Sequence, residues 1–236
     1  MENRKRIQFD EAQIRREISE KRPGIYEIRI LCTDFYSTKL SGYFHSADPE
    51  KMIQQIQNWR YPENCCVNFY MTSNPVKEFC EAREQFNDLR KTRIMTQDSD
   101  IDRLTWFVLD IDPEHPAGTS ATDSEKEAAR IQAGEAYSYM ETIGFTDPEI
   151  VDSGNGFHLK YAIDLDNTAE NQKSLESMIS DLHKRFPLID RAVTNPARIL
   201  KLPGTLAMKG RHTKERPFRM AKIIQSAGVK WKDGRQ

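Results

Sequence analysis

Two aspartates, Asp110 and Asp112, end an apolar run in the segment 104–113 (LTWFVLDIDP). Side chains two positions apart in a strand point to the same face, so both carboxylates leave a predicted strand on one side. Two carboxylates at the end of an apolar strand repel each other and resist desolvation. A hard divalent cation such as Mg²⁺ or Mn²⁺ suits paired oxygen ligands. The simpler interpretation of this pair alone is a strand that runs into a solvated acidic turn.

A third acid, Asp190, and a histidine, His158, would complete a site for phosphoryl transfer. Three carboxylates can hold two metal ions roughly 4 Å apart, which stabilise the attacking and leaving oxygens of an in-line displacement. We therefore predict Asp110, Asp112 and Asp190 as catalytic metal ligands. His158 and Lys160 would bind triphosphate oxygens. His158 alone is equally well explained as a strand histidine that is satisfied inside the fold.

The turn before His158 has the sequence Ser153-Gly154-Asn155-Gly156. Glycines allow the backbone to approach a ligand and expose N–H groups that can cradle phosphate. Asn-Gly is also a strong signal for a tight hairpin turn, and the two interpretations are compatible. We predict Gly154 and Gly156 as nucleotide-binding positions.

Cations follow the third acid along the chain. From Arg198 to the last residue there are 11 Lys and Arg against two acids, although the whole chain carries a net charge of −1. Arg and Lys neutralise a triphosphate or a nucleic-acid backbone, and a one-sided basic segment suggests a polyanion partner. A solvated basic face is the alternative. The predicted nucleotide-binding cations are Arg198 and Lys201, and the predicted nucleic-acid-binding residues are Lys209, Arg211 and His212.

The elements that must position these residues follow the order β-α-β-β-α-β. A capping box of Thr122 and Glu125 begins the first predicted helix, and Asn167 or Thr168 caps the second. This order is the ferredoxin-like plan, and right-handed crossovers give the strand order 4-1-3-2. The end of the first strand would then lie beside His158, with Asp190 near the same edge. The four predicted strands are 104–112, 148–152, 157–164 and 198–202.

The first 100 residues predict a smaller α/β unit. An amphipathic helix is expected within residues 1–22, and a second helix begins at Asp48-Pro49, where proline suits the first turn. Strands are expected at 24–31, 39–45 and 65–72. The fold class is therefore α+β: an RRM-like or ferredoxin-like sheet in residues 101–236, packed with an N-terminal α/β unit in residues 1–100 as one catalytic domain.

The composition of the 236 residues is that of a soluble globular chain, with 30% charged and 38% hydrophobic residues. No apolar run approaches the roughly 20 residues that cross a bilayer, and no signal-peptide core is present, so we expect a cytoplasmic protein without membrane contact. Four cysteines show no CxxC spacing. A zinc site built from Cys65, Cys66, Cys80 and His45 is therefore disfavoured.

Three segments together resemble the signature of the archaeo-eukaryotic primase (AEP) superfamily. They are an hhhDhD strand (WFVLDID, 106–112), a small-x-His motif (Gly156-Phe157-His158) and a later h-D (Ile189-Asp190). The trailing segment NPARILKLPGT…KG resembles primase–polymerase relatives carried by phages, plasmids and other mobile elements. The resemblance covers at least residues 104–212.

The resemblance implies a DNA primase–polymerase. Asp110, Asp112 and Asp190 would bind catalytic Mg²⁺ or Mn²⁺, and His158 would contact the phosphates of the incoming nucleotide, with Ser153 nearby. A 3′-hydroxyl would attack the α-phosphate of an NTP or dNTP on a single-stranded DNA template and release pyrophosphate, in primer synthesis for a mobile element. Relatives often continue into a helicase domain, so a helicase domain or protein is an expected partner. No zinc module is evident, so de novo priming stays open beside extension.

Two other classes of function compete with this interpretation. A non-catalytic RRM-like module would bind single-stranded nucleic acid with stacking aromatics, but only Trp106 is a candidate on the predicted open face. A metal-dependent nuclease or nicking enzyme on a similar sheet needs a His-hydrophobic-His pair, and the sequence has none. The sequence leaves open the choice of NTP or dNTP, the template motif and the oligomeric state.

Overall fold

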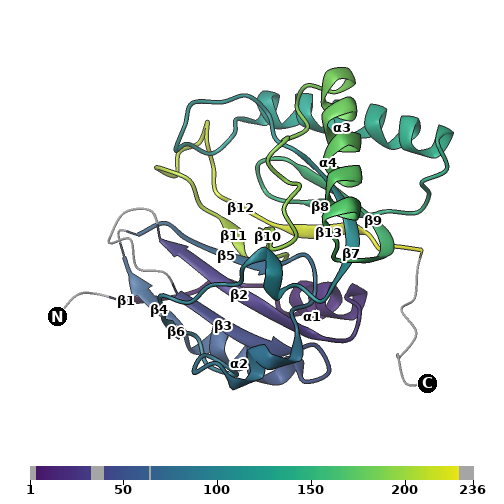
Figure 1. Ribbon diagram of the computed structural model, residues 1–236. Helices are drawn as coiled ribbons and strands as arrows, with labels where there is room; N and C mark the ends of the chain where they lie inside the picture. Colours follow the sequence, from purple (N-terminus) through teal and green to yellow (C-terminus); the bar gives the residue numbers. More distant parts are fainter. Residues whose placement is uncertain (1–3, 33–39, 64, 229–236) are drawn as a thin grey trace.

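A computed structural model describes residues 4–32, 40–63 and 65–228 of the chain. Two α/β layers are stacked on each other (Figure 1). Helices α1 (Glu11–Glu20) and α2 (Pro49–Asn58) cover one sheet, and α3 (Asp123–Thr142) and α4 (Ala169–Arg185) lie on the far side of the second sheet. Helix α1 lies between the layers and contacts β9 (Phe157–Asp166) and β13 (Lys222–Gln225) of the second sheet. The predicted mixed α+β class is confirmed.

The first layer is a five-stranded sheet in the order β10-β5-β2-β3-β6. One face of its strands packs with Ile14 and Ile18 of α1 and with Met52 and Ile56 of α2 in a buried core. On the opposite face, Glu27, Arg29 and Tyr43 form hydrogen bonds with Thr96 in the segment 76–100. The strands are β2 (Ile25–Cys32), β3 (Leu40–His45), β5 (Val67–Thr72), β6 (Arg90–Lys91) and β10 (Ile199–Lys201).

The second layer is an antiparallel four-stranded sheet in the order β13-β8-β9-β7. Its core lies between the sheet and helices α3 and α4, where Phe107, Leu109 and Ile111 are buried. Trp106 and Val108 belong to a separate cluster on the other face. The predicted alternation of the first strand is therefore confirmed. The strands are β7 (Arg103–Ile111), β8 (Glu149–Asp152), β9 (Phe157–Asp166) and β13 (Lys222–Gln225).

The predicted strand order 4-1-3-2 is wrong in its fourth strand. Residues 199–201 form β10, which pairs with β5 of the first layer, and Leu202 N donates to Phe69 O at 3.0 Å. The edge of β7 is instead met by the short segment 188–190, through a single bridge between Ile111 and Ile189. The turns at 191–197 then carry the chain across to the first layer, where β5 offers an unpaired edge.

Short elements complete the described chain. The predicted first helix begins only at Glu11, because residues 4–6 form β1 (Arg4–Arg6) against β4 (Arg60–Pro62). Residues 76–100 hold two short 3₁₀ helices. Strands β11 (Leu206–Ala207) and β12 (Arg219–Met220) form a hairpin, and β11 contacts β5 of the first layer.

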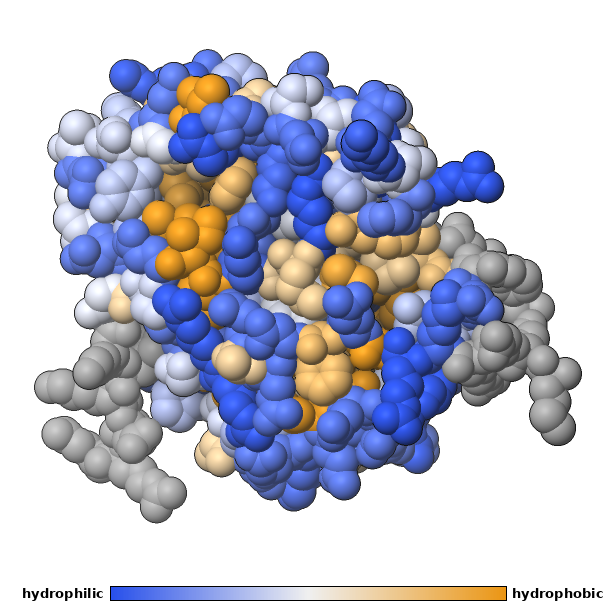
Figure 2. Space-filling model, turned by 180° about the vertical axis from the view of Figure 1, so that it is seen from behind, coloured by the Kyte–Doolittle hydropathy of each residue, from blue (hydrophilic) through white to orange (hydrophobic). Residues whose placement is uncertain are grey.

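The face of the molecule seen in Figure 2 is mostly hydrophilic at its rim and has apolar areas between the charged groups. Among the described helices, none combines the length and apolarity needed to span a membrane.

Candidate active site

Asp110 and His158 face each other across strands β7 and β9, whose register pairs these two residues directly. His158 Nε2 lies 3.4 Å from Asp110 Oδ1, and the two side chains are 4% and 18% exposed. Oδ1 is itself buried and makes no hydrogen bond within the described residues. The predicted convergence of these two residues on the open face of the sheet is therefore present.

Asp190 joins this pair through the backbone. Its N–H donates to Asp110 O at 2.8 Å, and Asp112 N donates to Leu188 O at 3.1 Å. The Asp190 carboxylate accepts a hydrogen bond from Ala192 N at 2.8 Å, which fixes its turn. Three acids from two distant segments thus meet at one edge of the second sheet.

Burial leaves the acids poorly solvated. The pKa of Asp110 is raised to about 6 by burial and then by the charge of Asp190, although Arg198 and Lys209 oppose the shift. The pKa of Asp112 is raised by burial and by Asp110. Burial also lowers the pKa of His158 to about 4, so its imidazole is neutral at pH 7. The site therefore holds excess negative charge that the histidine does not offset.

The facing wall comes from the first layer. Lys201 is buried, donates from Nζ to Leu206 O at 2.7 Å and lies 5.6 Å from the ring centroid of Tyr70. Burial holds the pKa of Lys201 well below its usual range, with a smaller contribution from Lys209. The pKa of Tyr70 is raised to about 12 by burial and by the charges of Asp112 and Asp110, which places this phenol within their field.

Tyr70 was not among the residues predicted from the sequence. The signal for it was the alternation within β5: Phe69 and Met71 enter the core with α1 and α2, so Tyr70 must point the other way. Nothing in the sequence of β5 itself indicated that the acids of β7 would lie opposite.

Lys160 does not belong to the site, contrary to the prediction. Its Nζ donates to both carboxylate oxygens of Glu17, at 3.0 and 3.2 Å, and to Glu149 Oε1. The side chain is 1% exposed. The alternation along β9 put Lys160 on the correct face, but its ammonium is already bound by these two carboxylates and is not available to a triphosphate.

The turn at 153–156 also differs from its predicted role. Ser153 N donates to Gly156 O, Gly154 N to Asp152 Oδ1 and Gly156 N to Ser153 Oγ, so three of its N–H groups are satisfied within or beside the turn. These groups do not form a phosphate cradle, and the predicted nucleotide contacts of Ser153, Gly154 and Gly156 lose that support. A Cβ at Gly156 would collide with Ile111 O and lie 2.6 Å from Asp112 Oδ1. The glycine is required for close packing beside Asp112.

The basic C-terminal segment divides into two parts. Arg198 and Lys209 lie near enough to lower the pKa of Asp110, which places their charges around the acids. Arg211 and His212 are exposed between β11 and β12. His212 accepts a hydrogen bond from Phe218 N at 2.9 Å, so its ring is held on this hairpin rather than turned toward the acids.

The acid site has some of the features of a divalent-cation site. In the described ranges, no group of three His, Cys, Asp or Glu side chains is arranged closely enough to hold a metal ion. Two features nevertheless fit: the donors are all carboxylates, which hard cations prefer, and the buried Asp110 Oδ1 lacks a hydrogen-bond partner among described residues. The chemistry of the donor set suits Mg²⁺ or Mn²⁺.

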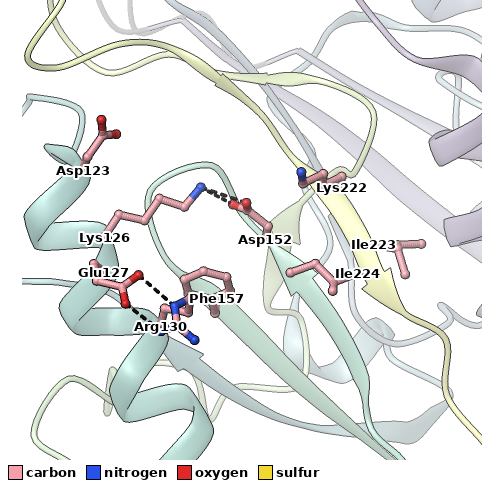
Figure 3. A pocket seen from close by; sticks show the side chains of 9 residues that line it. All are labelled: Asp123, Lys126, Glu127, Arg130, Asp152, Phe157, Lys222, Ile223 and Ile224. Carbon is pink, nitrogen blue, oxygen red and sulfur yellow. Dashed lines mark hydrogen bonds and ion pairs between the residues drawn. The ribbon is translucent and has the colours of Figure 1, made fainter.

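A separate cavity of about 500 Å³ lies beside α3, β8, β9 and β13 (Figure 3). Lys126 reaches across it to Asp152 at 2.8 Å, and Glu127 pairs with Arg130 on the helix. The three acids and His158 are not among its lining residues. Concavity alone therefore does not locate the acid site, which lies on the interlayer side of the sheet.

Comparisons with known proteins bear on the fold. No family model and no curated protein matches the sequence. The solved structure of primase RepB′ is similar with a TM-score of 0.50 and 10% identity, over 93% of this chain and 57% of that chain. The RepB′ catalytic domain in complex with initiator DNA gives a TM-score of 0.49 with 9% identity, over 93% of this chain and 86% of that one. The AEP domain of the cyanophage S-2L primase–polymerase gives 0.46 with 12% identity, over 95% and 94%.

The fold is therefore like that of a solved primase, and the resemblance seen in the sequence motifs is confirmed at the level of the fold. The arrangement of the sheets as a complete RRM-like unit is not reproduced, because β10 lies in the other layer.

Proposed function

We propose that this chain is a primase–polymerase-type nucleotidyltransferase, which joins an NTP or dNTP to a 3′-hydroxyl on a single-stranded DNA template. The observation that carries the proposal is the meeting of Asp110, Asp190 and His158 at one edge of an open sheet face. The shared fold supports the same class of protein but does not by itself assign an activity.

The residues around the acid site would have different roles. Asp110, Asp112 and Asp190 would hold Mg²⁺ or Mn²⁺, which supplies charge neutralisation at the reacting phosphate when bound. Neutral His158, with Nε2 directed at Asp110, orients that carboxylate. The cationic groups of Arg198 and Lys209 lie near Asp110 and would bind the triphosphate. Contact of His158 with nucleotide phosphate stays a prediction, as do a role in a mobile element and a helicase partner.

An incorporation assay tests the proposal directly. A single-stranded DNA template is incubated with labelled NTP or dNTP and Mg²⁺ or Mn²⁺, with and without a primer. We expect incorporation by the native chain and a loss on the order of 10³-fold in the Asp110→Ala/Asp112→Ala variant. New oligonucleotides without primer would establish priming, and extension alone would establish a polymerase.

The matched control is Glu176→Ala/Asp181→Ala, which removes the same charge from the outer helix α4. It should keep native activity. Native incorporation by the Asp110→Ala/Asp112→Ala variant would show that these acids are not catalytic. Template binding without any incorporation by the native chain would instead favour the non-catalytic RRM-like module.

A further inference from the structure

Four ionisable side chains are buried together between the two layers, and we refer to them as the interlayer ion cluster. Glu17 and Lys21 come from α1, Glu149 from β8 and Lys160 from β9. Their side chains are 0 to 5% exposed. Buried charges are costly unless they are paired, so their presence here requires an explanation.

Lys160 is the centre of the interlayer ion cluster. It binds both oxygens of Glu17 and one oxygen of Glu149, which uses the hydrogen-bonding capacity of the ammonium. Lys21 Nζ lies 3.0 Å from Glu17 Oε1 and 3.4 Å from Ser73 O at the end of β5. The cluster thus joins α1, β5, β8 and β9 through directional contacts.

The interlayer ion cluster lies directly beside the acid site. Along β9, His158 is paired with Asp110 of β7, and Lys160 is paired with Val108, two residues before Asp110. Lys160 Nζ also lies 4.9 Å from the ring centroid of Trp106. Helix α1, which supplies Glu17, is fixed in the core of the first layer. The cluster is therefore a rigid link between the layer that carries Lys201 and Tyr70 and the layer that carries the acids.

Stability alone does not account for such a link. Well-packed apolar residues of similar volume commonly replace a buried ion pair without loss of stability, and sometimes with a gain. Apolar contacts, however, have no preferred direction, whereas hydrogen-bonded ions accept only one arrangement. The specific effect expected of this cluster is therefore a fixed geometry.

We propose that the interlayer ion cluster is a positioning device, which sets the separation and angle of the two layers through Lys160. Its effect on catalysis rests on the proposed function, whereas its effect on layer geometry does not. Lys160 is a positioning residue and has no contact with the nucleotide.

The first test replaces the charges by apolar groups in Glu17→Leu/Lys21→Met/Glu149→Leu/Lys160→Met. We expect this variant to fold with a melting temperature close to that of the native chain. Its kcat for incorporation should fall on the order of 100-fold while KM for the nucleotide changes little, because small misplacements of reacting groups carry penalties of that size. The single substitution Lys160→Arg, made in the native chain, keeps the positive charge and should retain most of the native kcat. Native kcat in the folded apolar variant would overturn the proposal.

The second test measures the geometry without catalysis. Spin labels at Gln57→Cys on α2 and Glu176→Cys on α4, in a Cys32→Ser background, report the distance between the layers. The native cluster should give one narrow distance distribution, and the apolar variant a broader or shifted one. An unchanged distribution would refute the positioning role.

Two outcomes separate this proposal from the proposed function. If the native chain incorporates no nucleotide, the proposed function fails, and the distance distributions alone decide the positioning role. If the apolar variant does not fold, Glu149→Gln replaces it in both tests, because this change keeps the shape of the side chain and replaces the carboxyl group bound by Lys160 with an amide. Native kcat and a native distance distribution in Glu149→Gln would then count against the proposal.

Discussion

At the scale of single residues, the site is defined by carboxylates that the fold holds out of water. Ionisation of Asp110 is unfavourable, because this residue is buried, faces a neutral histidine and lies beside Asp190. A folded protein tolerates such a group when function requires it, and the cost appears as a raised pKa.

The raised pKa of Asp110 predicts a pH-dependent stability difference. The folded state holds the proton of Asp110 more tightly than the unfolded chain, so its contribution to stability is lost as pH rises from about 4 through about 6. In chelator-treated protein, Asp110→Asn should therefore match the native stability near pH 4 and exceed it at pH 7, by roughly 3 kcal/mol at most. Urea unfolding at a series of pH values measures the difference.

The native chain and the Asp110→Asn variant both contain His158, whose pKa is lowered by burial. This lowered pKa removes stability as pH falls below about 6.5 in the native chain and in the variant. A difference that is constant from pH 4 to pH 8 would contradict the assigned environment of Asp110.

The positions of the acids were predictable at this scale, but the partners of the cations were not. Strand alternation put Asp110, His158 and Lys160 on one face, and the structure confirms that face. It could not show that Glu17, 143 positions away, binds Lys160, because alternation gives a direction and not a neighbour. The same limit explains why Tyr70 was missed.

At the scale of elements, the turn between β8 and β9 positions Asp112 by close contact. Gly156 lies against the backbone at the end of β7, and no side chain fits there. The turn therefore acts as a spacer that keeps the strand end, and the carboxylate that follows it, in place.

Substitution of this glycine should disturb both stability and activity. Gly156→Ala forces the new Cβ against Ile111 O, so we expect destabilisation of about 1–3 kcal/mol and a loss of incorporation. Thermal melting and the extension assay measure the two effects. Gly134→Ala is the control: it lies in exposed α3 with no atom within 4 Å of the new Cβ, and should stabilise by roughly 0.5–1 kcal/mol. Equal effects at both positions would refute the steric argument.

Helices and the central strands were predictable from local signals, and the crossing of β10 was not. The capping box of Thr122 and Glu125 is present at the start of α3, and Thr168 caps α4. Residues 199–201 form a strand too short for periodicity to indicate its sheet. Its partner is decided by tertiary packing, where β5 leaves an edge free.

At the scale of the whole molecule, the charged residues of the site and its surroundings form two groups. One is the acids with the cations near them, and the other is the exposed basic hairpin between β11 and β12. The acids lie on the second layer, and Arg198 and Lys209 lie near enough to oppose the raised pKa of Asp110. The exposed residues between β11 and β12 would bind the backbone of a nucleic acid that extends from the acid site.

This distribution predicts a position-dependent effect of salt on template binding. Arg211→Gln/Lys214→Gln should reduce the slope of log affinity against log salt for single-stranded DNA by about 1.4, since each lost phosphate contact contributes about 0.7. Lys173→Gln/Lys184→Gln removes the same charge from outer helix α4 and should leave the slope unchanged. Fluorescence anisotropy at several salt concentrations measures both. Identical slopes for the two variants would mean that the hairpin does not contact DNA.

The crossing of β10 into the first sheet has a consequence for how the chain is made. While a ribosome has released only the first hundred residues, β2, β3 and β5 have already emerged, yet the outer border of β5 has no neighbour. An open border of this kind favours pairing with other chains. The first layer can close only after residues 199–201 leave the exit tunnel, so both halves must reach their final form late and together.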